Sequence, residues 1–253
     1  MRIDSPKAKE IPQLWNLWQE AFGDDASFIA SFQKTAFSQE RCRCAFIADT
    51  LASMLFWFDC SCRGEKIAYL YAIATKKSHR GQGLCKALMN DTHNYLKKSG
   101  YSGAILVPGE QELFHFYSRL GYHSSTTIGE LQCSASDKGI DLRKISAIEY
   151  RALRQFFLPD GAVIQENENM DFLSTMAEFY TSDKLLLAGR KIGEEFIGLE
   201  LLGNTSYAPK VLHKLQCKKG KFRILSQERP FSMYYPFIES SLSPTYFGLA
   251  FDL

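Results

Sequence analysis

The sequence lacks several features that would place the protein in particular functional classes. It has no marked excess of charge, because 30 basic residues stand against 28 acidic ones and leave a net charge of +2 at pH 7. A basic surface for nucleic acid or for an acidic membrane is therefore not expected. No apolar run is long enough to cross a bilayer, and the N-terminus MRIDSPKAKEIPQLW has charges and a proline where a signal peptide needs apolar residues. We therefore predict a cytoplasmic protein that has neither nucleic acid nor a membrane as its main partner.

Signals for disulfides and metal sites are also weak. The seven cysteines are an odd number, and in a reducing cytoplasm we expect them to stay thiols. Cys42, Cys44, Cys60 and Cys62 form two Cys-x-Cys pairs, whereas a structural zinc site usually has two residues between paired cysteines. The five histidines lack the spacing of two ligands on one helix. We predict no metal site, although four thiolates on neighbouring strands are chemically able to bind zinc.

The sequence does contain enough apolar material for a sizeable core. Hydrophobic residues make up 45% and charged residues 23% of its 253 residues, as in globular proteins. This length exceeds what one ordinary domain needs. We predict an α/β protein, with an α+β arrangement and a mixed sheet, that has two domains in tandem at residues 1–136 and 137–253. The boundary is expected in the polar segment 134–139.

Periodicity and turn signals predict the order of elements in the first half. Apolar residues three and four apart indicate amphipathic helices, and aromatic or aliphatic runs broken by polar turns indicate an antiparallel meander. After a short opening strand, we predict helices at 11–22 and 28–37, strands at 44–49, 52–59 and 66–75, a helix at 83–96, a strand at 104–107, a helix at 111–120 and a strand at 122–133.

The second half shows a similar start with weaker signals. We predict helices at 145–157, 170–180 and 209–216, a hairpin at 185–203, and strands at 222–225, 233–237 and 246–251. The hairpin LLLAGRKIGEEFIGLELLG follows two helices, as AFIADTLASMLFWF does in the first half. This self-similarity suggests a smaller α+β domain that repeats the first fold.

The string TKKSHRGQGLCKAL, residues 75–88, carries the clearest chemical signal. It places Arg80, Gly81 and Gly83 between a predicted strand and a predicted helix. Glycines allow a backbone to approach a pyrophosphate, and the amides and dipole of a helix start attract an anion. The glycines follow an antiparallel meander, which does not fit a dinucleotide-binding turn, and no lysine followed by serine or threonine marks a nucleoside-triphosphate loop.

With this loop the sequence resembles the GNAT superfamily of acyl-CoA N-acyltransferases over about residues 1–133. The family pattern is Arg or Gln, two residues, Gly, one residue, then Gly or Ala, and this chain reads RGQGLC at 80–85, with Cys85 at the last small position. The resemblance implies that acetyl-CoA or another acyl-CoA is a co-substrate, with its pyrophosphate on the loop and its pantetheine arm along the preceding strand. The implied cofactor-binding residues are Ile73, Ala74, Thr75, Arg80, Gly81, Gln82, Gly83, Leu84, Cys85 and Lys86.

A second motif, FHFYSRLGY at 114–122, matches the family's aromatic, Tyr, three residues, Gly, aromatic pattern. The resemblance implies that Tyr117 is catalytic and supplies a proton to the coenzyme A thiolate that leaves. The other interpretation of Tyr117 is a core aromatic residue that packs beside Phe114 and Phe116.

The sequence leaves the general base open. Some relatives have a carboxylate on the third meander strand. The matching position in this chain is Ile67, which cannot accept a proton. Glu65 and Asp59 are close in sequence, and Tyr69 and Tyr71 are able to face the cleft. Another candidate is the carboxylate at the end of the tail YFGLAFDL, because tandem-domain acetyltransferases of the enhanced-intracellular-survival type place their terminus in the active site.

We predict an N-acetyltransferase that moves an acyl group from acyl-CoA to a primary amine, of a small molecule or a protein, by direct attack. Two alternatives stay open: an acyl-CoA-binding sensor without catalysis, and a paired-domain aminoacyl or peptidoglycan-type transferase. The second half has no Arg-x-x-Gly-x-Gly turn after its hairpin. We therefore expect a degenerate GNAT-like domain that walls off the acceptor cleft or stabilises the first domain. The acceptor, the acyl-chain preference and the oligomeric state are not specified by these signals.

Overall fold

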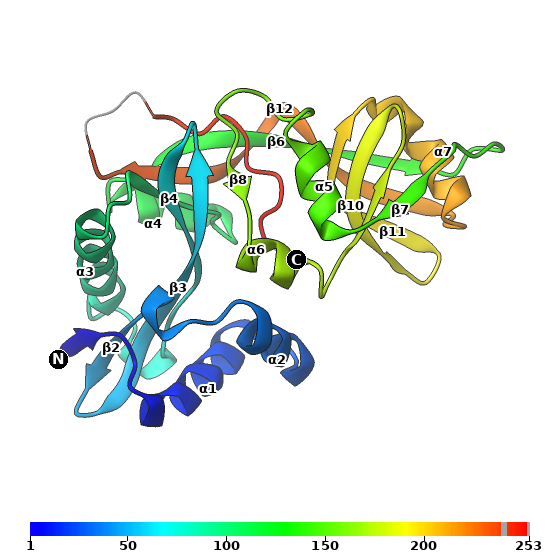
Figure 1. Ribbon diagram of the computed structural model, residues 1–253. Coiled ribbons are helices and arrows are strands. Elements are labelled where there is room, and N and C mark those ends of the chain that lie inside the picture. Colours follow the sequence, from blue (N-terminus) through cyan, green and yellow to red (C-terminus); the bar gives the residue numbers. More distant parts are fainter. Residues whose placement is uncertain (239–241, 252–253) are drawn as a thin grey trace.

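A computed structural model describes residues 1–238 and 242–251 and shows a mixed α/β protein built around one continuous sheet (Figure 1). This is the predicted fold class, and the predicted elements of the first half are present with boundaries shifted by a few residues. They are β1 (Arg2–Asp4), α1 (Ile11–Phe22), α2 (Ala26–Thr35), β2 (Cys42–Ile47), β3 (Thr50–Cys62), β4 (Glu65–Thr75), α3 (Leu84–Lys98), β5 (Gly103–Leu106), α4 (Gln111–Ser118) and β6 (His123–Ser134).

The second half differs more from the prediction. Its elements are β7 (Arg143–Ile145), α5 (Ala147–Arg154), β8 (Ile164–Gln165), α6 (Glu168–Leu173), β9 (Glu178–Thr181), β10 (Leu185–Ile192), β11 (Glu195–Gly203), α7 (Ala208–Lys214) and β12 (Lys219–Pro236). The predicted helix at 170–180 is wrong beyond Leu173, because residues 178–181 pair with β10 as a strand. The predicted strand at 246–251 is also wrong, since the described tail makes only an isolated bridge from Tyr246 to Ala162.

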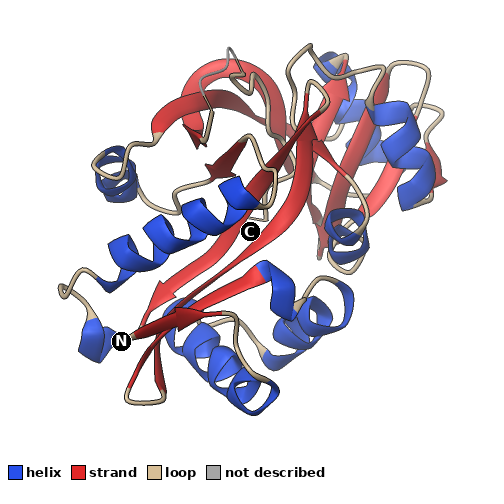
Figure 2. Cartoon of the chain, turned by 60° about the vertical axis from the view of Figure 1, so that its left-hand side comes forward, coloured by secondary structure: helices blue, strands red, loops and turns tan. Residues whose placement is uncertain are grey.

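The two faces of β3 pack against different helices. Phe56 and Phe58 belong to the buried cluster that contains Trp18 of α1 and Phe32 of α2. The alternate residue Trp57 belongs to the cluster around α3. This alternation follows from the two-residue period of a strand, and it places α1 and α2 on one face of the meander and α3 on the other (Figure 2).

Local signals set the ends of α1 and α2. Gly23 ends α1 in the left-handed region at φ 73° and donates its amide to the carbonyl of Gln19 at 3.0 Å. Asp25 then caps α2, because its carboxylate accepts the amide of Phe28 at 2.8 Å. Between the two helices, the rings of Trp18 and Phe32 are 4.7 Å apart. The short connection therefore holds both helices against the same face of the sheet.

Strand β12 joins the two halves. Its last residues, 233–236, pair antiparallel with β5, and its first residues pair parallel with β11. It also pairs with β6 over much of its length, with irregular register between Ile224 and Arg229. The two predicted strands at 222–225 and 233–237 are thus parts of one strand. The division into domains at 136/137 stays a proposal, and under it the second half supplies a strand to the sheet of the first.

Parallel strands β4 and β5 separate before they end. Their ladder runs from Ile67 with Gly103 to Tyr69 with Ile105 and stops there. Residues 70–75 of β4 and Leu106 with Val107 after β5 then line one cavity. The strand before the glycine loop, along which the resemblance places the pantetheine arm, thus lines a cavity. None of the helices in the described part of the chain has the length and apolar composition that a membrane span needs.

Candidate active site

The predicted cofactor segments and Tyr117 line a single cavity of about 1480 Å³. The residues of the predicted set that line it are Ile73, Ala74, Thr75, Arg80, Gly81, Gly83, Leu84, Cys85, Lys86 and Tyr117. Gln82 is the exception in this set, because its side chain turns back and its Nε2 donates to the carbonyl of Ser78 at 3.4 Å. The structure therefore brings together two motifs that are separated along the chain.

The loop before α3 leaves the helix start open. Gly81 and Gly83 have φ values of 75° and 77°, which favour glycine, and a Cβ added at either position would meet no heavy atom within 4 Å. Gly83 is the N-cap and offers no side chain. Within the described residues, the amides of 82–86 form no hydrogen bond. Unbonded amides at a helix start facing a cavity form an anion site.

Two hydrogen bonds fix the loop before α3 to neighbouring elements. Arg80 donates its Nε to the carbonyl of Thr75 at 3.1 Å, which folds its side chain across the end of β4. The amide of Lys77 donates to a carboxylate oxygen of Glu20 at 3.0 Å, which ties the loop to α1. These contacts hold the loop on the cavity wall.

A bulge in β4 distorts the strand beside the cavity. Met54 faces Ala74 and Phe56 faces Tyr71, so that Ala72 and Ile73 together stand opposite Leu55. Ala72 has a φ of 48°, in the left-handed region that a residue with a Cβ rarely adopts. The bulge turns this stretch of backbone out of the regular ladder. Strained backbone of this kind is often found at functional sites. The sequence carried no sign of the bulge, because an alanine there looks like an ordinary strand residue.

Tyr117 lies in the cavity wall on α4. Only 7% of the residue is exposed, and burial raises the pKa of its hydroxyl well above the ordinary value, with the nearby Cys85 as a smaller cause. Within the described residues the hydroxyl has no hydrogen-bond partner. Burial also raises the pKa of the Cys85 thiol to about 11. At neutral pH both groups are therefore protonated.

The candidate general bases fall into two groups, residues outside the cavity and residues that line it. Glu65 accepts a hydrogen bond from the hydroxyl of Ser102 at 2.5 Å, and Asp59 accepts one from Tyr101 and pairs with Lys66. Neither carboxylate lines the cavity, because both lie near the opposite end of the β3–β4 hairpin. Tyr69 and Tyr71 do line it.

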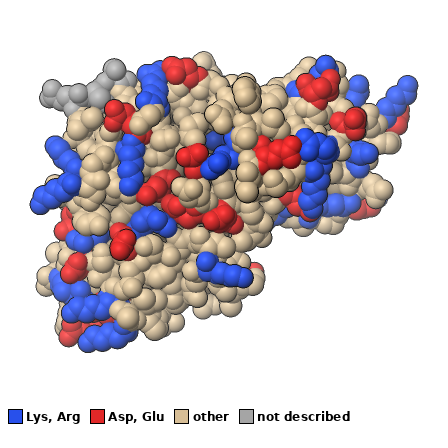
Figure 3. All heavy atoms as spheres, viewed as in Figure 1, with Lys and Arg blue, Asp and Glu red and all other residues tan. Residues whose placement is uncertain are grey.

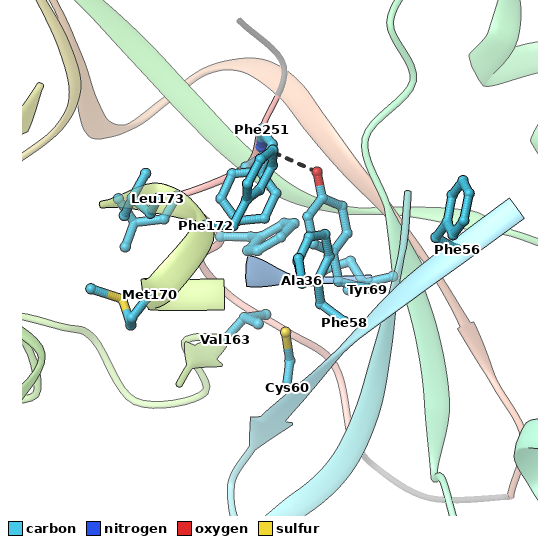
Figure 4. Close-up of a cluster of buried hydrophobic side chains, with 14 of the residues drawn as sticks. Ala36, Phe56, Phe58, Cys60, Tyr69, Val163, Met170, Phe172, Leu173 and Phe251 are labelled. Atoms are coloured by element: carbon cyan, nitrogen blue, oxygen red, sulfur yellow. Dashed lines mark hydrogen bonds between the residues drawn. The ribbon is translucent and has the colours of Figure 1, made fainter. Parts of the chain in front are cut away.

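The C-terminal tail enters the site from the second half. Phe251 lines the cavity, and its amide donates to the hydroxyl of Tyr69 at 3.2 Å (Figure 4). Its ring centroid is 4.8 Å from that of Phe58 and 5.1 Å from that of Phe172. Asp252 and Leu253, and with them the predicted terminal carboxylate, lie outside the described residues.

Side chains of the second half hold the tail in this place. Arg223 on β12 donates through Nη1 to the carbonyls of Gly248 at 2.6 Å and Ala250 at 3.3 Å. Gln165 on β8 donates to the carbonyl of Leu249 at 2.7 Å. Because these carbonyls are taken up by side chains, the tail stays extended without joining the sheet as a strand.

Several aromatic residues line the cavity. They include Trp18, Phe22, Phe28, Tyr71, Phe231 and Phe251. Sequence reasoning assigned the α1 residues among them only to a helix face. Periodicity identifies such a face, but it cannot separate residues that fill a core from residues that line a cleft beside it.

The cysteine pairs do not form a common site. Cys42 and Cys44 have their sulfurs 3.6 Å apart, whereas Cys62 donates to the carbonyl of Gly161 at 3.2 Å. In the part of the chain that the structure describes, no three His, Cys, Asp or Glu side chains group closely enough to hold a metal ion. On the face shown in Figure 3, basic and acidic side chains are mixed, and neither sign covers the surface alone.

Comparisons with known proteins agree with this geometry. Residues 2–124 match the family model of the acetyltransferase (GNAT) domain. A probable N-acyltransferase from Enterococcus faecalis has a TM-score of 0.70 at 17% identity, with 93% of this chain and 72% of that chain covered. A GCN5-related N-acetyltransferase from Anabaena variabilis gives 0.72 at 14%, with 94% and 73% covered, and Eis1 from Mycobacterium abscessus gives 0.67 at 13%, with 93% and 73% covered. At these identities the likeness shows the fold. No curated protein matches the sequence.

Proposed function

Because the first half of this chain is a domain of the GNAT acetyltransferase family, we propose that the protein is an N-acetyltransferase that uses acetyl-CoA or another acyl-CoA and acts on a primary amine. One observation carries this proposal. The open start of α3 and the buried residue Tyr117 line the same cavity. An anion-binding helix start and a proton donor are the two parts that acyl transfer from a diphosphate-bearing thioester needs.

The residues of the loop fit the pyrophosphate of coenzyme A. The space beside Gly81 and Gly83 is free, and the amides of 82–86 have no partner within the described residues. Lys86 lines the cavity and adds positive charge. We propose that these groups hold the pyrophosphate and that the edge of β4 at Ile73 to Thr75, which has no β5 partner, holds the pantetheine arm.

Acyl-CoA supplies an activated thioester carbonyl, and the chain's own residues do the rest. The bulged backbone near Ile73 is suited to donate a hydrogen bond to the carbonyl oxygen as it gains negative charge. In the reaction the N–C bond forms, the C–S bond breaks, the amine loses a proton and the sulfur gains one. We propose that Tyr117 gives the sulfur its proton. We assign no side chain as the general base, since an ordered water can carry the amine's proton away.

The change that tests this proposal most simply is Tyr117→Phe. We expect acyl transfer to slow by about 10- to 1000-fold, because the general acid is lost, while acetyl-CoA affinity changes little. Coenzyme A release from acetyl-CoA across a panel of amines measures the rate. Tyr95→Phe removes one hydroxyl outside the cavity and is the matched control. Unchanged turnover in Tyr117→Phe would remove Tyr117 from the mechanism.

The pH profile gives a second readout for the same residue. Because burial holds the pKa of Tyr117 above its ordinary value, its proton is present throughout the neutral range. We expect no loss of rate from ionisation of Tyr117 below about pH 10. A falling limb near pH 8 that disappears in Tyr117→Phe would contradict this assignment.

A non-catalytic acyl-CoA sensor is the second candidate. It is favoured by one observation, that Ile67 occupies the position of a carboxylate base and that neither Glu65 nor Asp59 lines the cavity. The amine panel separates the two functions. A sensor binds acetyl-CoA and releases no coenzyme A with any amine, whereas an acetyltransferase releases it with at least one.

A further inference from the structure

Two arginines from the second half line the cavity without an ionic partner. Arg190 comes from β10 and Arg229 from β12. Neither forms an ion pair within the described residues. The Nε of Arg190 is shut off from solvent and has no hydrogen-bond acceptor there. Arg229 has its guanidinium carbon 6.0 Å from the ring centroid of Phe231, and its charge also acts on the carboxylate of Glu130 without forming an ion pair with it.

Other arginines of this half are occupied. Arg154 pairs with the fully buried Glu200 at 2.7 Å, and Arg143 pairs with Glu149 at 2.6 Å. Arg223 holds the carbonyls of the tail. A charged group without an ionic partner in a cavity wall is suited to bind a ligand of opposite charge. Arg190 and Arg229 are such groups, and together they point to an anion that enters the cavity.

Aromatic and acidic residues also line the cavity. The rings of Trp18 and Tyr71 have centroids 5.7 Å apart, as do those of Tyr71 and Phe251, and Tyr71 is the least buried of the three. Asp24 also lines the cavity, and its carboxylate accepts the indole N–H of Trp18 at 2.7 Å. A cavity lined by both cations and a carboxylate fits a molecule that carries both charges.

Resting on the proposed function, we propose that the acceptor is an amine that also carries an anionic group, a carboxylate or a phosphate. Arg190 and Arg229 bind this anion, and the apolar body of the acceptor lies against the rings of Phe22 and Tyr71, which line the cavity and are not fully buried. A guanidinium suits this role because its planar donors match the oxygens of both anions. The second half thereby selects the acceptor, while the first half holds the thioester.

The test compares amines that differ only in the anion. Phenylalanine is set against phenylalaninamide, and phosphoethanolamine against ethanolamine, and kcat/KM is measured by coenzyme A release. The variants are Arg190→Gln and Arg229→Gln. The control is Lys191→Gln, which removes the same charge from the next residue, whose ammonium donates to the carbonyls of Leu215 and Gln216 outside the cavity.

We expect wild-type protein to favour an anionic member of one pair. Arg190→Gln should lower kcat/KM for that member by about 10- to 100-fold, the range for a lost hydrogen bond to a charged group, and leave its uncharged partner nearly unchanged. The carboxylate pair and the phosphate pair show which anion is bound. Each ratio is taken between variant and wild type for one substrate, so differences in amine pKa cancel.

Three results would overturn the proposal. Equal losses for the charged and uncharged members would make Arg190 a structural residue. A higher KM for acetyl-CoA, with acceptor preference unchanged, would assign the anion to the cofactor. A preference for the uncharged member in wild type, once each rate is expressed per concentration of free amine, would exclude an anionic acceptor.

A binding measurement separates this proposal from the proposed function. N-acetylphenylalanine and its amide are titrated into protein saturated with coenzyme A, which requires no turnover. Tighter binding of the acid, lost in Arg190→Gln, supports the anion site even if the amines of the panel are not acetylated. Equal binding of acid and amide to wild type, together with no preference between phosphoethanolamine and ethanolamine, would contradict it.

Discussion

The connections from β4 to α3 and from β11 to α7 occupy the same place in the two halves, since each leads from the second strand of a hairpin through a helix into a parallel strand. In the first connection Gly81 and Gly83 adopt positive φ and leave amides unbonded in the described residues. In the second, Asn204 accepts the amide of Ser206 at 3.1 Å, and Pro209, which has no amide hydrogen, lies in the first turn of α7. In the second connection a side chain therefore takes one amide and a proline removes another, so that fewer amides are left for an anion.

The strand pairs that flank the two connections differ in the same sense. The β4–β5 ladder stops at Tyr69, whereas the β11–β12 register resumes after an irregularity and continues to Leu201 and Ile224. The ring of Phe222 fills the space beside Gly198, where an added Cβ would approach within 2.5 Å. Strands β11 and β12 of the second half thus stay paired over the stretch where β4 and β5 of the first half separate. This supports our proposal that residues 137–253 form a degenerate GNAT-like domain without a cofactor loop.

The largest effect should come from separating the halves. A chain of residues 1–136 lacks the part of β12 that pairs with β5, and it exposes that strand edge. It also loses Tyr235, whose ring lies 4.4 Å from that of His93. We expect this fragment to show no cooperative thermal transition by circular dichroism, whereas the full chain shows one. A fragment that melts as sharply and at the same temperature as the full chain would mean that the halves are independent.

A smaller effect should come from releasing the tail. Arg223→Ala removes the donor to the carbonyls of Gly248 and Ala250. We expect a loss of about 1–3 kcal/mol in the free energy of unfolding and a higher KM for the acceptor, because the wall at Phe251 loosens. Acetyl-CoA affinity should stay the same, since the cofactor loop belongs to the other half. A weakened acetyl-CoA affinity would contradict this division of roles.

The smallest effect concerns a histidine at the junction. Burial lowers the pKa of His93 to about 4, from an ordinary value of 6.5. The unfolded chain therefore takes up a proton that the folded protein refuses, and stability is lost as pH falls from about 6.5 to 4, by at most about 3 kcal/mol. His93→Gln should flatten this part of the curve in denaturant titrations. Equal slopes for variant and wild type would show that the ring titrates freely.

The first half was largely predictable because its signals are local. The spacing of Leu14, Trp15 and Trp18 identifies α1, and the glycines at 81 and 83 identify the loop. The bulge at Ala72, the crossing strand β12 and the place of Phe251 were not predictable in this way. They depend on contacts between residues far apart in sequence, such as Phe251 with Tyr69, and no periodicity records such contacts.

Acyl-CoA binding at the open start of α3 is the central step of the proposed function, and titration of acetyl-CoA by calorimetry tests it most directly. Gly83→Glu places a carboxylate at the helix start, and we expect it to abolish binding while the fold is kept. Gly64→Glu is the control, because Gly64 has nearly the same backbone angle, φ 80° against 77°, in open space away from the cavity. We predict that acetyl-CoA binds to wild type and to Gly64→Glu but not to Gly83→Glu. Undiminished binding to Gly83→Glu would contradict it.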